Sequence, residues 1–357
     1  MNDFKDKAIF TPGPVRMYPE TLELGSKQAP YFRNKEFSKV IFKCEEILLE
    51  ILNAPENSKV IFLTASGTAG MESVVQNLLD NDAKTLIING GGFGQRFVDI
   101  CKLHQINYTQ YKIINNNLSN IDQLYQYKDS SSLLINGHET SIGVLYDLES
   151  VGKFCSENNI LNIVDAVSLF VTDILDMQKQ NIDALIVSSH KGLALPPGLT
   201  MVVLSPKAIK KINPLKSYYF NFDSYLINGK RGQTPFTPAV TIILQLHARL
   251  KQIQNDGIEF HINRAKDAAC YFREQITSLP LNFYSNFMPN AMTTLTPTDG
   301  KSAFNIAHDL EKFYNVVVAT NGGDLKDKVF RVSHMGNMNR AYVDKLIDAL
   351  NDYYSIN

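Results

Sequence analysis

The chain has 357 residues, of which 44% are hydrophobic and 20% are charged, and its formal net charge at pH 7 is −1. This composition is typical of a folded globular protein, and the near-neutral charge argues against a nucleic-acid partner. No run of about 18 apolar residues occurs and the first residues lack the apolar core of a signal peptide, so we expect a cytoplasmic protein that binds no membrane.

Short β-rich runs alternate with segments of helical spacing from about residue 60 onward. The predicted strands cover residues 60–64, 85–89, 132–136, 162–166, 184–189 and 200–205. Helical spacing is clear in the first intervening segment, through the apolar residues Met71, Val74, Val75, Leu78 and Leu79. Strands that alternate with helices predict an α/β fold with a mostly parallel sheet covered by helices.

The C-terminal part of the chain follows a different pattern. Residues 217–232 are rich in Tyr, Phe, Asn and Gly, and a helical run then extends from about residue 238 to 279 with a break at 255–257. Beyond it the order strand, strand, helix, strand, strand, helix predicts a small α/β domain. We therefore divide the chain into an N-terminal arm at residues 1–20, a large domain at 21–255 and a small domain at 256–357.

The four cysteines are far apart, in segments with helical spacing, at Cys44, Cys101, Cys155 and Cys270. None belongs to a CxxC pair or to a spacing typical of zinc ligands. We expect four buried free thiols and no metal site.

Asp165 ends one predicted strand and Lys191 follows the next. The carboxyl ends of strands are the edge where α/β sheets build binding sites. A lysine amine can bond to the aldehyde of pyridoxal phosphate, and a carboxylate can keep the pyridine nitrogen of this cofactor protonated. Taken singly, Asp165 could be a strand-end cap and Lys191 a solvated lysine. The apolar strand before Lys191 and the apolar segment 195–199 after it disfavour the second alternative.

The segment SSHKGLALPPGL at residues 188–199 and the segment IVDAVSLF at residues 163–170 resemble the lysine and aspartate segments of class V aminotransferases. Further landmarks of that family follow in order from Thr11 to Gly336, beginning with the segment TPGP at 11–14. The resemblance implies the pyridoxal-phosphate fold of type I, with a seven-stranded, mostly parallel sheet between helices and a small C-terminal domain. It also implies Lys191 and Asp165 as catalytic residues that hold the cofactor.

The resemblance extends to further cofactor contacts. Ser66, Gly67 and Thr68 open a predicted helix and would hold the phosphate, although an ordinary capped turn is the alternative. Phe93 would stack on the ring, in a glycine-rich segment that lacks the third glycine of a dinucleotide loop. The remaining contacts that the resemblance implies are Thr140 or Ser141 to the ring oxygen, His190 to the phosphate, Val167 beside Asp165, and Thr234 and Thr237 to the cofactor of a neighbouring subunit.

Two arginines complete the predicted site. Arg331, in the segment FRVSHMG, resembles the family's arginine that binds the substrate carboxylate through its planar fork. Arg33 resembles a residue near the substrate entrance. The contacts from Thr234 and Thr237 imply a homodimer whose active sites are shared across the interface.

The resemblance implies an aminotransferase, nearest to the 2-aminoethylphosphonate:pyruvate and the alanine or serine:glyoxylate branches. The donor would be 2-aminoethylphosphonate, alanine, serine or aspartate, and the acceptor a small 2-oxo acid such as pyruvate or glyoxylate. The alternatives are a lyase, desulfurase or epimerase on the same fold, since the fold does not choose among these reactions. A non-catalytic protein that kept the fold, or a nucleotide-binding protein, are the alternatives of another class.

Overall fold

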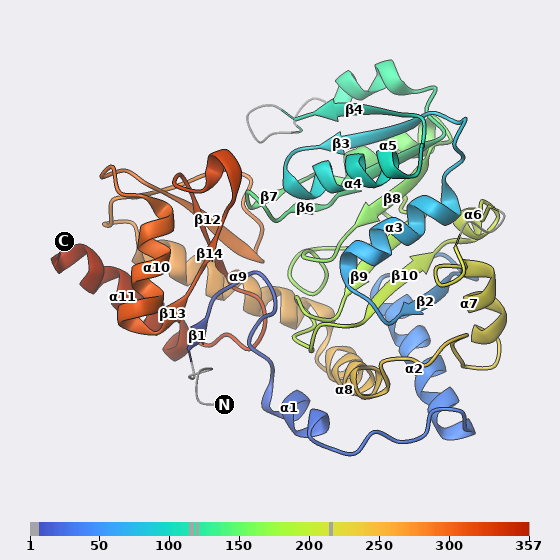
Figure 1. The fold of residues 1–357 in the computed structure, drawn as a ribbon, viewed down its shortest axis with the longest axis horizontal. Coiled ribbons are helices and arrows are strands. Elements are labelled where there is room, and N and C mark those ends of the chain that lie inside the picture. The colour runs from blue at the N-terminus through green and yellow to red at the C-terminus, as the bar shows by residue number, and fades with distance from the viewer. Residues whose placement is uncertain (1–6, 114–117, 119–120, 214–216, 357) are drawn as a thin grey trace.

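A seven-stranded sheet lies at the centre of the computed structural model, which describes residues 7–113, 118, 121–213 and 217–356 (Figure 1). The strand order is β2-β10-β9-β8-β5-β3-β4. The bounds are β2 Lys59–Leu63, β3 Thr85–Asn89, β4 Tyr108–Lys112, β5 Ser132–Asn136, β8 Leu161–Asp165, β9 Ala184–Ser188 and β10 Thr200–Leu204. Among the seven strands described in this sheet, β10 alone runs opposite to the other six, so the prediction of a mostly parallel sheet is confirmed.

Helices cover both faces of this sheet, because its strands carry apolar side chains in both directions. In β3, Leu86 and Ile88 belong to one hydrophobic cluster and Ile87 to another. The first cluster is closed by α2 (Lys35–Ile51), α5 (Leu148–Glu157) and α8 (Val240–Asp256). The second is closed by α3 (Gly67–Leu78), α4 (Gly92–Leu103), α6 (Pro206–Ile209) and α7 (Phe222–Gly229). The result is a three-layer sandwich of helices, sheet and helices.

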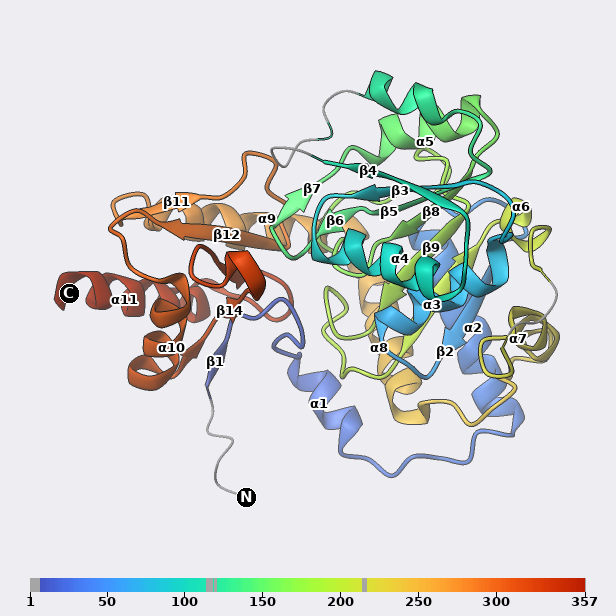
Figure 2. The same ribbon diagram turned by 45° about the horizontal axis from the view of Figure 1, so that its top comes forward.

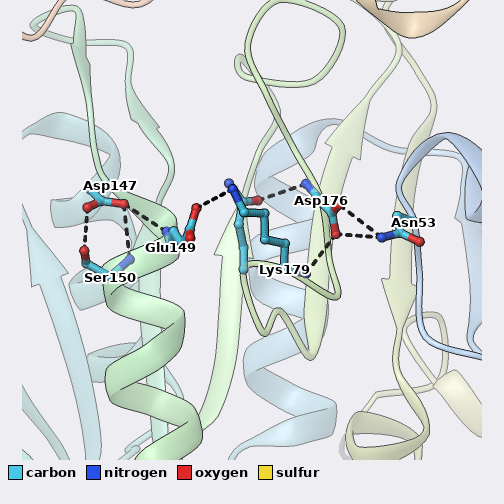
Figure 3. Close-up of polar contacts among 7 residues, drawn as sticks. Asn53, Asp147, Glu149, Ser150, Asp176 and Lys179 are labelled. Atoms are coloured by element: carbon cyan, nitrogen blue, oxygen red, sulfur yellow. Dashed lines mark hydrogen bonds and ion pairs between the residues drawn. The ribbon is translucent and has the colours of Figure 1, made fainter.

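The connection from β8 to β9 is long, and polar contacts tie it to the helices around it (Figure 3). The Asp176 carboxylate accepts hydrogen bonds from Asn53 Nδ2 at 3.0 Å and from the Lys179 backbone N–H at 2.8 Å. Lys179 Nζ pairs with Glu149 at 2.8 Å, next to the Asp147 side chain that caps α5. These contacts are exposed, so each contributes little free energy, but together they fix the connection between the strands that carry Asp165 and Lys191.

The C-terminal part builds a second, four-stranded antiparallel sheet of order β11-β12-β15-β14. Its elements are α9 Ile258–Gln275, β11 Leu281–Phe283, β12 Met292–Pro297, α10 Ala303–Tyr314, β13 Val316–Val317, β14 Ala319–Thr320, β15 Phe330–Ser333 and α11 Arg340–Ile356. The predicted order of strands and helices agrees with the structure except between α10 and α11, where three strands stand in place of the expected two. Short β1 (Ala8–Ile9) pairs with β13, so the N-terminal segment joins this part before α1 (Pro19–Gly25) leads to the large sheet (Figure 2).

The predicted break in the long C-terminal helix occurs where expected. Helix α8 ends at Asp256 and α9 begins at Ile258, with Gly257 at φ 80° between them. This backbone conformation favours glycine, because a Cβ would be strained there. The domain limits set at residues 20/21 and 255/256 stay a prediction.

Three details differ from the sequence prediction. Strand β4 was missed, because its sequence YTQYK is polar and only partly buried at the edge of the sheet. Residues 316–320 form two short strands where the predicted order has one, since β13 pairs with β1 whereas β14 pairs with β15. The expectation of four buried thiols is wrong for Cys270, which is exposed on α9, and right for the other three.

No helix of the described segments is long and apolar enough to cross a bilayer.

Helix α5 approaches the β8 to β9 connection so closely that Gly152 has no room for a side chain. A Cβ on Gly152 would lie 1.8 Å from the carbonyl oxygen of Gln180. We expect Gly152→Ala to lower the free energy of unfolding by about 1–3 kcal/mol, because backbone must shift, as measured by urea denaturation. The control is Gly229→Ala in α7, where nothing lies within 4 Å; helix propensity should make it neutral or slightly stabilising. Equal effects of the two substitutions would contradict the packing argument.

Candidate active site

Asp165, the last residue of β8, has both carboxylate oxygens fixed by neighbours. The Val167 backbone N–H donates to Oδ1 at 2.9 Å, and Asn136 Nδ2 at the end of β5 donates to Oδ2 at 2.7 Å. Burial raises the pKa of Asp165 to about 6, and these hydrogen bonds and the charge of Lys191 oppose the rise. The neighbouring strand ends thus hold this carboxylate in one orientation.

Lys191 is 8% exposed, directly beyond β9, at the same edge of the sheet. Loss of solvation lowers the pKa of its amine to about 8; Asp165 opposes this shift, whereas the positive charges of Arg331 and Arg96 add to it. Within the described segments, Lys191 Nζ has no hydrogen-bond or ion-pair partner. A buried amine that has no partner among the described residues, and whose lowered pKa leaves a substantial neutral fraction near physiological pH, is a candidate nucleophile and base.

The segment 11–14 packs on the Lys191 side chain. A Cβ on Gly13 would lie 2.9 Å from Lys191 Cδ and 3.0 Å from His190 Cδ2, and Gly13 has φ +143°. Both the contact and the conformation require glycine. The His190 ring lies within hydrogen-bond distance of Ser188 Oγ at 3.2 Å, and burial, followed by the charge of Lys191, lowers its pKa to about 4. His190 is therefore neutral beside Lys191.

Helix α3 begins next to the aspartate segment. A Cβ on Gly67 would lie 3.1 Å from Val167 Cγ2, so glycine lets the start of the helix approach that segment. Ser66 is the N-cap residue, but its side chain makes no capping hydrogen bond. The N–H groups in the first turn of a helix lack partners within the helix and favour anions. Gly67 and Thr68 belong to this first turn.

Glu139, to which the sequence motifs assign no role, links the segment of Phe93 to the segment of Thr140 and Ser141. Its side chain is fully buried and accepts hydrogen bonds from the N–H groups of Phe93 at 3.2 Å and Gly94 at 2.9 Å, at the start of α4. It also accepts one from Ser141 Oγ at 2.5 Å, and Ser141 Oγ in turn accepts one from the Gly92 N–H at 2.9 Å. The carboxylate therefore fixes Phe93 relative to the loop that carries Thr140.

Thr140 and His138 face the segment after Asp165. The Thr140 hydroxyl hydrogen-bonds to the Ser168 hydroxyl, and His138 Nδ1 lies 3.2 Å from the Ser168 carbonyl oxygen. Burial lowers the pKa of His138 to about 3, so its ring is neutral, and a proton on Nδ1 would satisfy that carbonyl. His138 Nε2 is buried and has no partner within the described segments.

Arg331 on β15 brings the C-terminal sheet to this group. Its Nη1 donates to the Thr140 carbonyl oxygen at 3.0 Å and its Nη2 to the Thr320 carbonyl oxygen at 2.6 Å. Its Nε is buried and makes no hydrogen bond to the described part of the chain. Burial lowers the pKa of Arg331 to about 10, so the guanidinium remains charged at neutral pH. An unsatisfied, charged donor beside Lys191 can receive a carboxylate.

The other three predicted residues form a separate group. Arg33 donates to Gln233 Oε1 at 3.3 Å, to the Thr234 carbonyl oxygen at 2.9 Å and to the Pro235 carbonyl oxygen at 3.3 Å. The Thr234 hydroxyl donates to the Phe236 carbonyl oxygen at 2.7 Å, and Thr237 is exposed. No hydrogen bond or ion pair between described residues joins this group to Lys191 or Arg331.

Comparison with known proteins identifies this arrangement. The family Aminotransferase class-V matches residues 25–341. The chain belongs to the class V aminotransferase family. The predicted family is thereby confirmed, and the protein is an enzyme of the pyridoxal-phosphate-dependent transaminase class.

Its similarities extend over nearly the whole chain. An uncharacterized aminotransferase of Methanocaldococcus jannaschii is 27% identical, over 94% of this chain and 89% of the relative. L-aspartate–glyoxylate aminotransferase of Paracoccus denitrificans is 25% identical, over 93% and 87%. The solved structure of an aspartate aminotransferase of subgroup IV from Thermus thermophilus is 26% identical, covers 98% of this chain and 99% of its own, and has a TM-score of 0.91. The predicted fold type is therefore confirmed.

The lowered pKa of Lys191 can be tested in the cofactor-free protein. Because only the neutral amine reacts, carbamylation of Lys191 by cyanate should reach half its maximal rate near pH 8. Lys179 is the control, since its ion pair with Glu149 raises its pKa above the ordinary value. Mass spectrometry after labelling at several pH values measures both sites. Equal midpoints for Lys191 and Lys179 would contradict the described environment.

Proposed function

We propose that this protein transfers an amino group from a small donor to a small 2-oxo acid with pyridoxal phosphate bound at Lys191. The observation that carries the proposal is a buried Lys191 amine that senses the charges of an anchored carboxylate, Asp165, and of an arginine, Arg331. Among the described residues, neither the Lys191 amine nor Arg331 Nε has a hydrogen-bond partner. The relatives named aminotransferases support it. The acceptor would be pyruvate or glyoxylate, and the donor alanine, serine, aspartate or 2-aminoethylphosphonate.

The chemistry of the residues matches the parts of the cofactor. Lys191 offers an amine to its aldehyde, and Asp165 a carboxylate to its ring nitrogen. Ser66, Gly67 and Thr68, at the start of α3, and the neutral His190 suit its phosphate. The Phe93 ring would stack on the pyridine, with Val167 beside Asp165.

We assign the ring oxygen contact to Thr140 rather than to Ser141. The Ser141 hydroxyl already donates to Glu139 and accepts from Gly92. The Thr140 hydroxyl hydrogen-bonds to the Ser168 hydroxyl, and its contact with the His138 carbonyl oxygen is long, at 3.5 Å, so it can exchange that weak contact for a further group.

Bound pyridoxal phosphate supplies an electron sink that stabilises negative charge at the substrate α-carbon. Lys191, with a pKa near 8, can take a proton from that carbon and return one, since both its protonation states are accessible near neutral pH. Asp165 keeps a proton on the ring nitrogen. Arg331 Nε binds the substrate carboxylate and sets which bond at the α-carbon points toward the Lys191 amine.

We further propose a cytoplasmic homodimer in which Thr234 and Thr237 reach the phosphate site of the partner. The exposure of Thr237 supports the proposal, as does the finding that no hydrogen bond or ion pair between described residues joins this group to Lys191. Arg33 holds the segment in place through three hydrogen bonds to its acceptors. In a dimer, Arg33 would stand near the substrate entrance of the neighbouring site.

A desulfurase is disfavoured by the cysteines. Burial raises the pKa of Cys44, Cys101 and Cys155 to about 12, so these thiols stay protonated. Cys270 is exposed, but it lies in a surface cleft between α9 and α11 together with Tyr271 and Arg340. Sulfur transfer needs a reactive thiolate beside the cofactor, and these positions do not supply one.

The visible absorption spectrum tests the proposed function. The protein loaded with pyridoxal phosphate should show a visible band that one donor bleaches and that pyruvate or glyoxylate restores. Alanine, serine, aspartate and 2-aminoethylphosphonate are added singly, without an acceptor, to name the donor. Lys191→Ala should lose turnover. A band that no donor bleaches, or keto product formed in large excess over the enzyme without any acceptor, would contradict transamination and favour another reaction on the same fold, such as that of a lyase.

The role of Arg331 is tested by steady-state kinetics. Arg331→Lys keeps the charge but loses the planar fork, so the KM for the 2-oxo acid should rise roughly 10- to 100-fold. The affinity for pyridoxal phosphate should change by less than about threefold, because Arg331 is assigned to the substrate. An unchanged KM would remove Arg331 from the substrate site.

A further inference from the structure

Arg96, on α4, connects two of the segments assigned to the cofactor and has no role so far. Its guanidinium lies over the Phe93 ring, with Cζ 4.6 Å from the ring centroid. Its Nη1 donates a hydrogen bond to Thr68 Oγ1 on α3 at 2.9 Å. One side chain thus contacts both the residue assigned to stack on the pyridine ring and a residue assigned to the phosphate.

The contact with Phe93 leaves one ring face for the cofactor. A cation over an aromatic face is attracted by the negative potential of that face. Because the guanidinium covers one face, it also fixes the rotamer of Phe93, whose backbone N–H is held by Glu139. The Glu139 carboxylate therefore fixes the main chain of Phe93, and the Arg96 guanidinium fixes its ring.

The contact with Thr68 determines where the hydroxyl proton of Thr68 can point. A threonine hydroxyl has one proton to donate and two lone pairs to accept. Arg96 occupies a lone pair, so the proton is free for an acceptor at the start of α3, where an anion is favoured. The positive charge of Arg96 also polarises the hydroxyl in that direction.

Arg96 is close enough to the lysine to affect it electrostatically. Its charge is one of the causes that lower the pKa of Lys191. Removal of this charge should therefore raise the pKa of Lys191 and shift the carbamylation midpoint of the cofactor-free protein to higher pH. The midpoint therefore reports the charge of Arg96 near Lys191, whereas cofactor affinity reports how Arg96 positions Phe93 and Thr68.

We propose that Arg96 is a positioning residue for pyridoxal phosphate, which orients the Phe93 ring and the Thr68 hydroxyl as the cofactor's ring and phosphate require. The proposal rests on the proposed function, because it takes the pyridoxal phosphate site as given. It adds a residue that does not itself contact the cofactor, and it assigns the link between stacking and phosphate binding to one guanidinium.

The test compares Arg96→Met, which removes the charge, with Arg96→Lys, which keeps it but loses the planar group. Lys102→Met is the matched control, since it removes one positive charge from an exposed position in the last turn of the same helix. We expect Arg96→Met to weaken the binding of pyridoxal phosphate roughly 10- to 100-fold, measured by equilibrium dialysis. Arg96→Lys should fall between Arg96→Met and the wild type, and Lys102→Met should bind as the wild type does.

A double-mutant cycle with Thr68→Val separates positioning from general damage. If Arg96 acts through the Thr68 hydroxyl, Arg96→Met should weaken cofactor binding by a much smaller factor in the Thr68→Val background than in the wild type. The carbamylation midpoint of Lys191 should rise in Arg96→Met and stay constant in Arg96→Lys and Lys102→Met. This second readout uses the cofactor-free protein, so it does not depend on turnover.

Two results would overturn the proposal: cofactor binding by Arg96→Met within about threefold of the wild type, or fully additive effects in the cycle with no shift of the Lys191 midpoint. A wild-type protein that binds no pyridoxal phosphate would instead overturn the proposed function itself. The two failures are thus distinguishable.

Discussion

The site depends on a lysine amine that the fold removes from water. Burial disfavours the charged form of an amine and lowers its pKa, and at Lys191 this effect exceeds the opposing attraction of Asp165. Burial also disfavours the charged form of a carboxyl group, and it raises the pKa of Asp165 to about 6. Hydrogen bonds from Asn136 and Val167 hold that carboxylate in place, and no residue that the structure describes hydrogen-bonds to the amine.

This constraint explains the close packing around the lysine. The carboxyl ends of parallel strands meet at one edge of the sheet, so β3, β5, β8 and β9 deliver their following loops to the same place. The space over the lysine is closed by segments from outside the sheet, which include Gly13 of the N-terminal segment and Arg331 of the C-terminal sheet. These two contacts are possible because β1 pairs with β13 and Gly13 carries no side chain.

Much of the fold was predictable, because local patterns carry it. In the large sheet, the strands that were predicted are those buried on both faces, with continuous apolar runs such as TLIIN at 85–89. Strand β4 escaped because an edge strand needs no such run. Cys270 was misjudged because helical spacing places a residue on a face, but it does not show whether a neighbour covers that face. Glu139, Asn136 and Arg96 were missed because their partners lie far away in sequence, although Glu139 stands directly beside Thr140.

The sequence by itself determined the α/β class, the positions of Asp165 and Lys191 at strand ends, and the family, because spacing and motif are properties of neighbouring residues. The tertiary structure decided which of these residues meet. It placed Arg331 against the Thr140 carbonyl group, engaged the Ser141 hydroxyl with Glu139, and set Arg33 on the segment of Thr234, apart from Lys191. Such pairings follow from strand order and from the packing of distant elements, and no local pattern in a single sequence encodes them.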